Sequence, residues 1–186
     1  YTITVEDANG CLTTLQVSIT EPEVLTMTTD NLVDVLCFGD ANGSATVAPM
    51  GGTAPYQVTI NNFTTIQHVP GGQTYTFTNL TANTYNAQVR DASGCEFAVE
   101  FTINTPTELT MTESSATDPL CFEGNDGQIV VEVDGGTAPY SLTVNAQPQG
   151  VNLQAGEHTI SNLAAGTYVM EVTDANGCTA MVTTTL

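Results

Sequence analysis

The chain has 186 residues, of which 41% are hydrophobic and only 11% are charged. Twenty Asp or Glu residues stand against one Lys or Arg, so the formal net charge is −19. This balance excludes a nucleic-acid binder and disfavours anionic membrane surfaces, since both need a basic surface. The hydrophobic content argues against a disordered acidic tail, and no apolar run is long enough to span a membrane.

The first predicted element is a β-hairpin within residues 1–20. Asn-Gly between two alternating runs is a strong hairpin signal, because both residues tolerate positive φ. Alternation places Leu15, Val17 and Ile19 on one face, which we expect to be buried. The turn occurs three times, as Asp7-Ala-Asn-Gly-Cys11, Asp91-Ala-Ser-Gly-Cys95 and Asp174-Ala-Asn-Gly-Cys178. We therefore expect one such hairpin near the end of each of three repeats.

Two further phrases recur at the same spacing of about 84 residues. Leu36-Cys37-Phe38 returns as Leu120-Cys121-Phe122, and Gly51-Gly-Thr-Ala-Pro-Tyr56 returns as Gly135-Gly-Thr-Ala-Pro-Tyr140. This register predicts a truncated repeat over residues 1–20 and two full repeats over residues 21–105 and 106–186. Because repeats of this kind form arrays, we expect the chain to be a fragment of a longer one.

Within each full repeat the pattern is that of short strands. Ile129, Val131 and Val133 alternate along one run and so share one face of a strand, and so do Met170 and Val172 in the run before the third hairpin. Helix signals are nearly absent. About seven short strands separated by turns predict an all-β fold of tandem immunoglobulin-like β-sandwiches.

A tight turn before a tyrosine is predicted in both full repeats. Asn83 and Gly166 occupy the same slot, which favours a left-handed backbone there, and each is followed two residues later by Tyr85 or Tyr168. A leucine, a tight turn and then a tyrosine resemble the tyrosine corner of immunoglobulin-like sandwiches. These four residues are expected to be structural.

Together the phrases resemble a known family. The string from Gly166 to Cys178, the upstream cysteine-containing turn and the Gly-Gly-Thr-Ala-Pro-Tyr phrase are similar to the SprB-type repeat of Bacteroidota gliding-motility and cell-surface adhesins. This resemblance covers the chain repeat by repeat. It implies a long secreted or cell-surface protein of tandem immunoglobulin-like units, exported by the type IX route.

The five cysteines recur with the repeats, and small β-rich units with repeated cysteines are typical of an oxidising, extracellular setting. The simplest pairing is Cys37–Cys95 and Cys121–Cys178, which leaves Cys11 unpaired by truncation. Three alternatives stay open. They are Cys11–Cys37 with Cys95–Cys121 across the junctions, Cys37–Cys178 between successive repeats, and free buried thiols.

Calcium is the one cofactor that the loops after Cys37 and Cys121 suggest. Carboxylate and amide oxygens gather there in short loops, as a hard cation prefers, on Asp40, Asn42, Glu123, Asn125 and Asp126. The competing interpretation is turn chemistry, because Asp, Asn and Gly are also the residues whose side chains bond their own backbone in turns.

No catalytic arrangement is found. His68 and His158 do not align in the repeat register, and neither a nucleophile triad nor a phosphate-binding loop is present. We therefore expect a non-enzymatic structural segment of an extracellular stalk or filament, whose partners are neighbouring repeats. The alternative is an adhesive module that contacts surface polysaccharide or a cell-surface protein through residues 61–73, where the two repeats differ.

Overall fold

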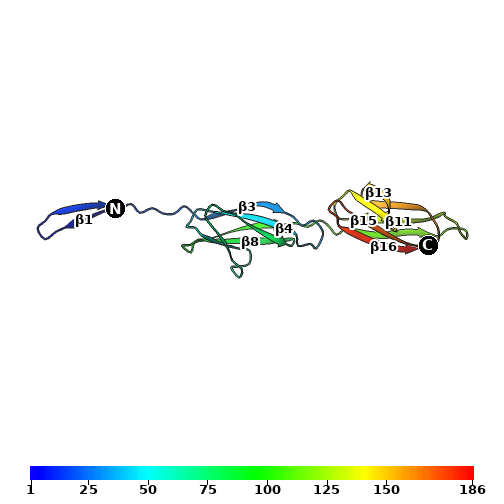
Figure 1. The fold of residues 1–186 in the computed structure, drawn as a ribbon, viewed down its shortest axis with the longest axis horizontal. Helices are drawn as coiled ribbons and strands as arrows, with labels where there is room; N and C mark the ends of the chain where they lie inside the picture. Colours follow the sequence, from blue (N-terminus) through cyan, green and yellow to red (C-terminus); the bar gives the residue numbers. More distant parts are fainter. The chain divides into compact units, whose positions relative to one another are not determined.

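The computed structural model describes residues 1–186, and all of its regular elements are β-strands (Figure 1). It contains no helix of the length and apolarity that crossing a membrane requires. The strands are β1 (Thr2–Glu6), β2 (Leu12–Gln16), β3 (Thr26–Val33), β4 (Gly43–Met50), β5 (Tyr56–Thr59), β6 (Gln67–Val69), β7 (Tyr75–Leu80), β8 (Asn83–Arg90), β9 (Glu96–Ile103), β10 (Thr110–Thr117), β11 (Gly127–Asp134), β12 (Tyr140–Val144), β13 (Gln147–Leu153), β14 (Gly156–Leu163), β15 (Thr167–Thr173) and β16 (Thr179–Thr185).

The same seven-strand topology occurs twice. We call β3–β9 the first repeat and β10–β16 the second repeat. In the first repeat the sheets have the strand orders β3-β4-β7 and β6-β5-β8-β9, and in the second they have the orders β10-β11-β14 and β13-β12-β15-β16. The first, second and fifth strands thus share one sheet, and the other four share the second. This is an immunoglobulin-like sandwich, so the predicted fold class is confirmed.

The core of the second repeat follows the predicted period of two. Ile129 and Val131 on β11 are fully buried, as are Met170 and Val172 on β15. These residues belong to one hydrophobic cluster that both sheets supply. Each fully buried Val or Ile stabilises the fold by about 1.5–3 kcal/mol relative to leaving it exposed. In the first repeat, β4 and β5 bury Ala45, Val47 and Val58 in the same alternating way.

The hairpin β1–β2 differs from the prediction. Its two strands form the predicted antiparallel hairpin, with pairs from Thr2 opposite Gln16 to Glu6 opposite Leu12. However, Leu15 is 61% exposed and Ile19 is 73% exposed, so the apolar face is not buried. The reason is that β1 and β2 form a two-stranded sheet of their own, with no second sheet to cover it.

The chain divides into two compact units that do not follow the repeat boundaries. One unit comprises Tyr1–Thr28, Val47–Tyr75 and Asn86–Val99, and the other comprises Thr29–Thr46, Thr76–Tyr85 and Glu100–Leu186. The second unit therefore contains the whole second repeat together with three segments of the first, residues 29–46, 76–85 and 100–103, of which residues 29–46 include the β3–β4 loop. The division of the chain at residues 20 and 105 stays a prediction.

Candidate functional site

An aspartate organises the turn of each Asp-x-x-Gly-Cys hairpin. In the β15–β16 hairpin, Oδ1 of Asp174 accepts hydrogen bonds from the backbone N–H groups of Asn176 and Cys178, both at 2.9 Å. Gly177 has a φ of 87°, which a side chain would disfavour. The same two bonds form at Asp7 and at Asp91. The cysteine after each turn is therefore held at a fixed position.

The second carboxylate oxygen fastens each complete hairpin to the Gly-Gly-Thr-Ala-Pro-Tyr loop. Oδ2 of Asp174 accepts the Thr137 N–H at 2.8 Å, and the buried Tyr140 hydroxyl closes that loop by donating to the Gly135 carbonyl at 2.6 Å. Asp91 and Tyr56 make the equivalent bonds in the first repeat. Asp174 itself is only 6% exposed, and its buried carboxylate is satisfied by these three N–H donors.

These hydrogen bonds change the acidity of Asp7 and of Asp91. The N–H groups of the turn, that of Cys11 first, hold the pKa of Asp7 below its ordinary value. Burial alone would raise the pKa of Asp91, but the N–H groups of Thr53, Cys95 and the turn outweigh burial, so this pKa is also lowered. Both carboxylates are consequently ionised at neutral pH and act as fixed acceptors.

The loop after Leu36 is closed by Asn42, which also donates to Asp40; both residues are predicted calcium ligands. The Asn42 Oδ1 accepts the Leu36 N–H at 3.1 Å, and the Asn42 side-chain amide donates to Asp40 Oδ2 at 2.9 Å. Upstream, both the backbone and side-chain amides of Asn104 donate to Asp34, at 2.8–3.2 Å. These contacts fix the segment that carries Cys37.

The equivalent loop of the second repeat uses Asp126 in the place of Asn42. Its Oδ1 accepts the Leu120 N–H at 3.1 Å. Glu123 has a φ of 61°, which turns the loop, and Asn125 is exposed. No group of three or more His, Cys, Asp or Glu side chains that could hold a metal ion is present in the structure. Calcium binding therefore stays a prediction. If these loops bind calcium, a chelator should lower the melting temperature of the protein by several degrees. Identical melting curves with and without chelator would contradict it.

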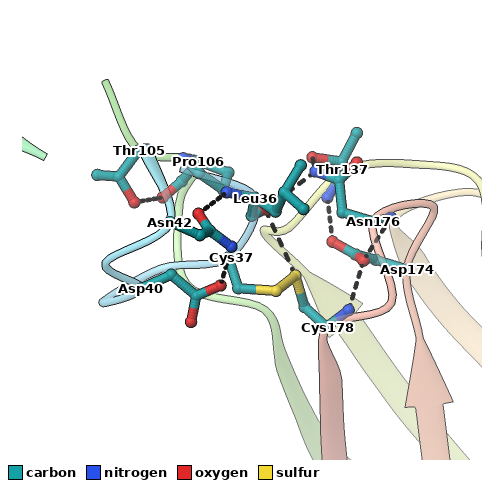
Figure 2. Close-up of a disulfide and its surroundings, with 10 residues drawn as sticks. All are labelled: Leu36, Cys37, Asp40, Asn42, Thr105, Pro106, Thr137, Asp174, Asn176 and Cys178. Carbon is teal, nitrogen blue, oxygen red and sulfur yellow. Dashed lines mark hydrogen bonds between the residues drawn. A yellow bond between two sulfur atoms is a disulfide. The ribbon is translucent and has the colours of Figure 1, made fainter. Parts of the chain in front are cut away.

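The loop and the third hairpin meet in a disulfide between Cys37 and Cys178, which are 141 residues apart (Figure 2). A second contact lies beside it, where the Asn176 side-chain amide donates to the Leu36 carbonyl at 2.9 Å and to the Thr137 hydroxyl at 3.1 Å. We call this arrangement the loop–hairpin junction. It joins the first repeat covalently to the second.

The predicted pairing of the cysteines differs from the structure. Cys37–Cys95 and Cys121–Cys178 do not form: Cys37 bonds Cys178, while Cys95 and Cys121, as well as Cys11, are exposed free thiols. The bond that forms is the alternative between successive repeats.

Strand length explains why the bridge within the second repeat fails. After Cys178, β16 runs for seven residues to Leu186, whose side chain approaches Gly127 beside Pro119, close to the loop that carries Cys121. Seven residues of strand span roughly 23 Å. Disulfide-bonded cysteines need Cα atoms within about 7 Å. Cys178 therefore precedes one end of β16, whereas the loop of Cys121 lies beside the other end, too far away for a disulfide.

The two predicted corner tyrosines make the expected type of bond. Tyr85 donates its hydroxyl to the Thr81 carbonyl at 3.0 Å, and Tyr168 donates to the Ala164 carbonyl at 2.8 Å. Each acceptor lies four residues upstream, as in a tyrosine corner.

The left-handed positions are not where the sequence placed them. Neither Asn83 nor Gly166 has positive φ; the positive values belong to Asn79 and Asn162, at 57° and 63°. The Asn162 position is a β-bulge in the β11–β14 pairing, which explains the φ. Gly166 instead exchanges two backbone hydrogen bonds with Leu186. The asparagine before the leucine in both repeats, Asn79 or Asn162, was the signal that could have identified these positive-φ positions.

Residues 61–73 differ between the repeats, as predicted. The β12–β13 turn is tight, with Asn145 and Ala146 at positive φ. The first repeat has a longer loop in which Phe63 lies under the Arg90 guanidinium, 4.4 Å from the ring centroid. Arg90 also pairs with Glu96. The single cationic side chain of the chain is thus held at this loop.

Comparison with known protein families gives a match in each of the two repeats. The SprB repeat family matches residues 29–65 and 114–146, one segment in each repeat. Each matched segment includes the Gly-Gly-Thr-Ala-Pro-Tyr phrase and the loop that begins with Leu-Cys-Phe, residues 36–42 or 120–126, which we call the Cys-Phe loop. No curated protein has a sequence that matches the chain.

Several solved structures are similar. The C-terminal 282-residue fragment of intimin, in complex with the intimin-binding domain of the translocated intimin receptor, is 19% identical with a TM-score of 0.46; the similarity covers 91% of this chain and 64% of that one. Three N-terminal domains of the bacteriophage RB49 outer capsid protein Hoc are 14% identical, with a TM-score of 0.42 and coverages of 88% and 58%. The Clostridium thermocellum CbhA fibronectin(III)-like modules are 11% identical, with a TM-score of 0.35 and coverages of 85% and 91%.

Proposed function

We propose that this chain, which carries two SprB-type repeats, is a structural segment of a long extracellular stalk in a bacterial cell-surface adhesin. The parent protein would serve gliding motility or attachment in a member of the Bacteroidota and would be exported by the type IX route. The segment itself is non-enzymatic, and its partners are neighbouring repeats. SprB repeats occur in cell-surface proteins, and the disulfide suits an oxidising exterior.

The observation that carries this proposal is the loop–hairpin junction. A bond between Cys37 and Cys178 encloses nearly all of both repeats, so tension applied to the ends of the chain bypasses the residues between them. The strands between Cys37 and Cys178 would then stay folded under loads that separate unlinked sandwiches. The net charge of −19 keeps neighbouring stalks apart in solution.

Single-molecule stretching of the chain from its two ends tests this mechanical role. In the oxidised chain, the 141-residue segment is shielded and adds almost nothing to the final extension. Reduction, or the Cys37→Ser variant, should release roughly 480 Å more at about 3.4 Å per residue. The Cys121→Ser variant is the matched control and should extend like the unmodified chain. Equal extension with and without reductant would contradict the proposal.

The second candidate function is ligand binding at the Phe63 loop, where a specific cavity supports it. A cavity of about 160 Å³ is lined by Phe63, Phe97, Gln88, Glu96 and Ala98. The buried Gln88 Oε1 has no hydrogen-bond partner there. An aromatic ring beside an amide oxygen suits a hydroxyl-bearing ligand such as a surface polysaccharide, or a side chain of another cell-surface protein.

Exchange of the loop tests the binding function. Replacing residues 61–66 by the Asn145-Ala146 turn of the second repeat should abolish binding on a glycan array, and Phe63→Ala should weaken it. His158→Ala, in the second repeat, is the control. Binding that survives the loop exchange would eliminate this candidate.

A further inference from the structure

We propose that Asn176 is a deamidation site, and that its conversion to aspartate or isoaspartate breaks the hydrogen-bonded part of the loop–hairpin junction. Asn176 precedes Gly177, and a glycine after an asparagine leaves its backbone nitrogen open to attack, because it carries no side chain. The proposal rests on the proposed function, since loss of this contact matters most where the junction bears load. It adds a chemical step that weakens the junction permanently.

The asparagines of two Asn-Gly pairs bind the two polar backbone groups of Leu36 (Figure 2). The Asn42 Oδ1 accepts the Leu36 N–H at 3.1 Å, whereas the Asn176 side-chain amide donates to the Leu36 carbonyl at 2.9 Å. Asn42 is followed by Gly43, and Asn176 by Gly177. At Leu36, Asn42 is therefore an acceptor and Asn176 is a donor.

Deamidation preserves the acceptor and abolishes the donor. A carboxylate still accepts an N–H, and the second repeat has this arrangement, where Asp126 Oδ1 accepts the Leu120 N–H at 3.1 Å. An ionised carboxylate at residue 176 has no hydrogen to donate, so it would place an oxygen against the Leu36 carbonyl oxygen. The Thr137 hydroxyl, the second acceptor of the Asn176 amide, can turn to donate, but a carbonyl cannot. The contact at Leu36 is therefore lost.

The engaged junction holds both nitrogens that take part in the reaction. The nitrogen that leaves is the side-chain amide of Asn176, which donates to the Leu36 carbonyl and to the Thr137 hydroxyl. The nitrogen that attacks belongs to Gly177, whose N–H donates to the Asp174 carbonyl at 3.1 Å. Ring closure needs these bonds to break, so the reaction is slow in the engaged junction and faster once the junction opens.

The reaction consumes only water. The Gly177 nitrogen attacks Cγ of Asn176, and a new carbon–nitrogen bond forms as the bond from Cγ to the side-chain nitrogen breaks. That nitrogen leaves as ammonia, which takes up the proton of the Gly177 amide. Water then opens the resulting succinimide at either carbonyl and gives aspartate or isoaspartate. The new carboxyl group is ionised at neutral pH. No electrons are transferred, so the disulfide is not consumed.

The rate of deamidation is measured on the full chain at mildly alkaline pH. Mass spectrometry follows residues 172–186, a peptide in which Asn176 is the one asparagine. Cys37→Ser should deamidate roughly tenfold faster than the unmodified chain, because the junction opens more readily without the disulfide. Thr137→Val, which keeps the disulfide and removes one acceptor, should react several-fold faster. Cys121→Ser is the matched control and should react at the unmodified rate. Equal rates in all four proteins would overturn the proposal.

Asn176→Asp tests the consequence of deamidation, because it places the product directly in the chain. In glutathione buffers, the equilibrium constant for closing the Cys37–Cys178 bond should fall several-fold, since the contact beside the bond is lost. The matched control combines Asp40→Asn with Asn42→Asp, which keeps the charge and an acceptor in the loop and should leave this constant unchanged. An unchanged constant in Asn176→Asp would overturn the proposal.

The proposed function fails by a different result. Stretching of the unmodified chain reports whether the 141-residue segment is shielded, and this measurement needs no deamidation. A shielded segment together with no effect of Asn176→Asp contradicts the deamidation proposal alone. An unshielded segment together with the expected rates and closing constants contradicts the stalk role alone.

Discussion

The two Cys-Phe loops begin with the same three residues and are each closed by one side chain, yet only one of them is engaged. Asn42 closes the loop of Cys37 and Asp126 closes the loop of Cys121, each by accepting the N–H of the preceding leucine. Cys37 is bonded to a hairpin of the next repeat, and Cys121 is an exposed thiol. Local sequence therefore sets the shape of the loop, whereas the neighbouring repeat decides whether its cysteine is used.

Removal of each cysteine should give the largest contrast between the loops. Cys37→Ser opens a bond between residues 141 apart, and the chain-entropy model assigns such a bond about 5 kcal/mol of unfolding free energy. Cys121→Ser should leave stability unchanged. Urea unfolding followed by tyrosine fluorescence measures both. Equal destabilisation by the two variants would contradict the engaged-versus-free distinction.

The aspartates of the engaged and free hairpins give the next contrast. Asp174→Ala leaves the N–H groups of Thr137, Asn176 and Cys178 without an acceptor, which should cost about 3 kcal/mol. Asp7 is exposed and holds only its own turn, so Asp7→Ala should not change the unfolding of the two repeats. Urea titrations of both variants measure these changes in unfolding free energy. If Asp174→Ala has no effect, the aspartate does not hold the hairpin in position.

The smallest effect concerns acid. The pKa of Asp91 is lower in the folded chain than in the unfolded one, so its contribution to stability is full above about pH 4 and is lost as the pH falls through the folded value. Melting temperatures between pH 7 and pH 2.5 should therefore fall less steeply for Asp91→Asn than for the unmodified chain. Glu100→Gln, an exposed strand substitution, should leave the slope unchanged. If the melting temperatures of all three proteins fall in parallel as the pH is lowered, the ionised Asp91 carboxylate does not stabilise the fold.

The fold was predictable because strand periodicity and hairpin turns are local signals. Ile129, Val131 and Met170 are buried where alternation places them. Alternation does not report whether a second sheet exists, which is why Leu15 was expected to be buried and is exposed. The pattern of a single sequence shows which residues share a face of a strand, whereas tertiary packing decides which of these faces are buried.

The junction was less predictable, since cysteine spacing alone permits several pairings. Cys37 and Cys178 are far apart in sequence, and nothing near either residue indicates that the Asn176 amide meets the Leu36 carbonyl. The length of β16 was the available signal, because a cysteine before a seven-residue strand cannot reach the loop beyond its far end. Similarly, Asn79 and Asn162 have the positive φ values that had been expected at Asn83 and Gly166.

Peptide mapping under non-reducing conditions tests the junction most directly. Cleavage after Arg90 and after glutamates places the five cysteines in five separate peptides, residues 7–23, 24–90, 91–96, 114–123 and 172–186. The junction requires that residues 24–90 remain joined to residues 172–186 until a reductant is added, with the other three peptides free. Recovery of residues 24–90 joined to 91–96, or of residues 114–123 joined to 172–186, would contradict it.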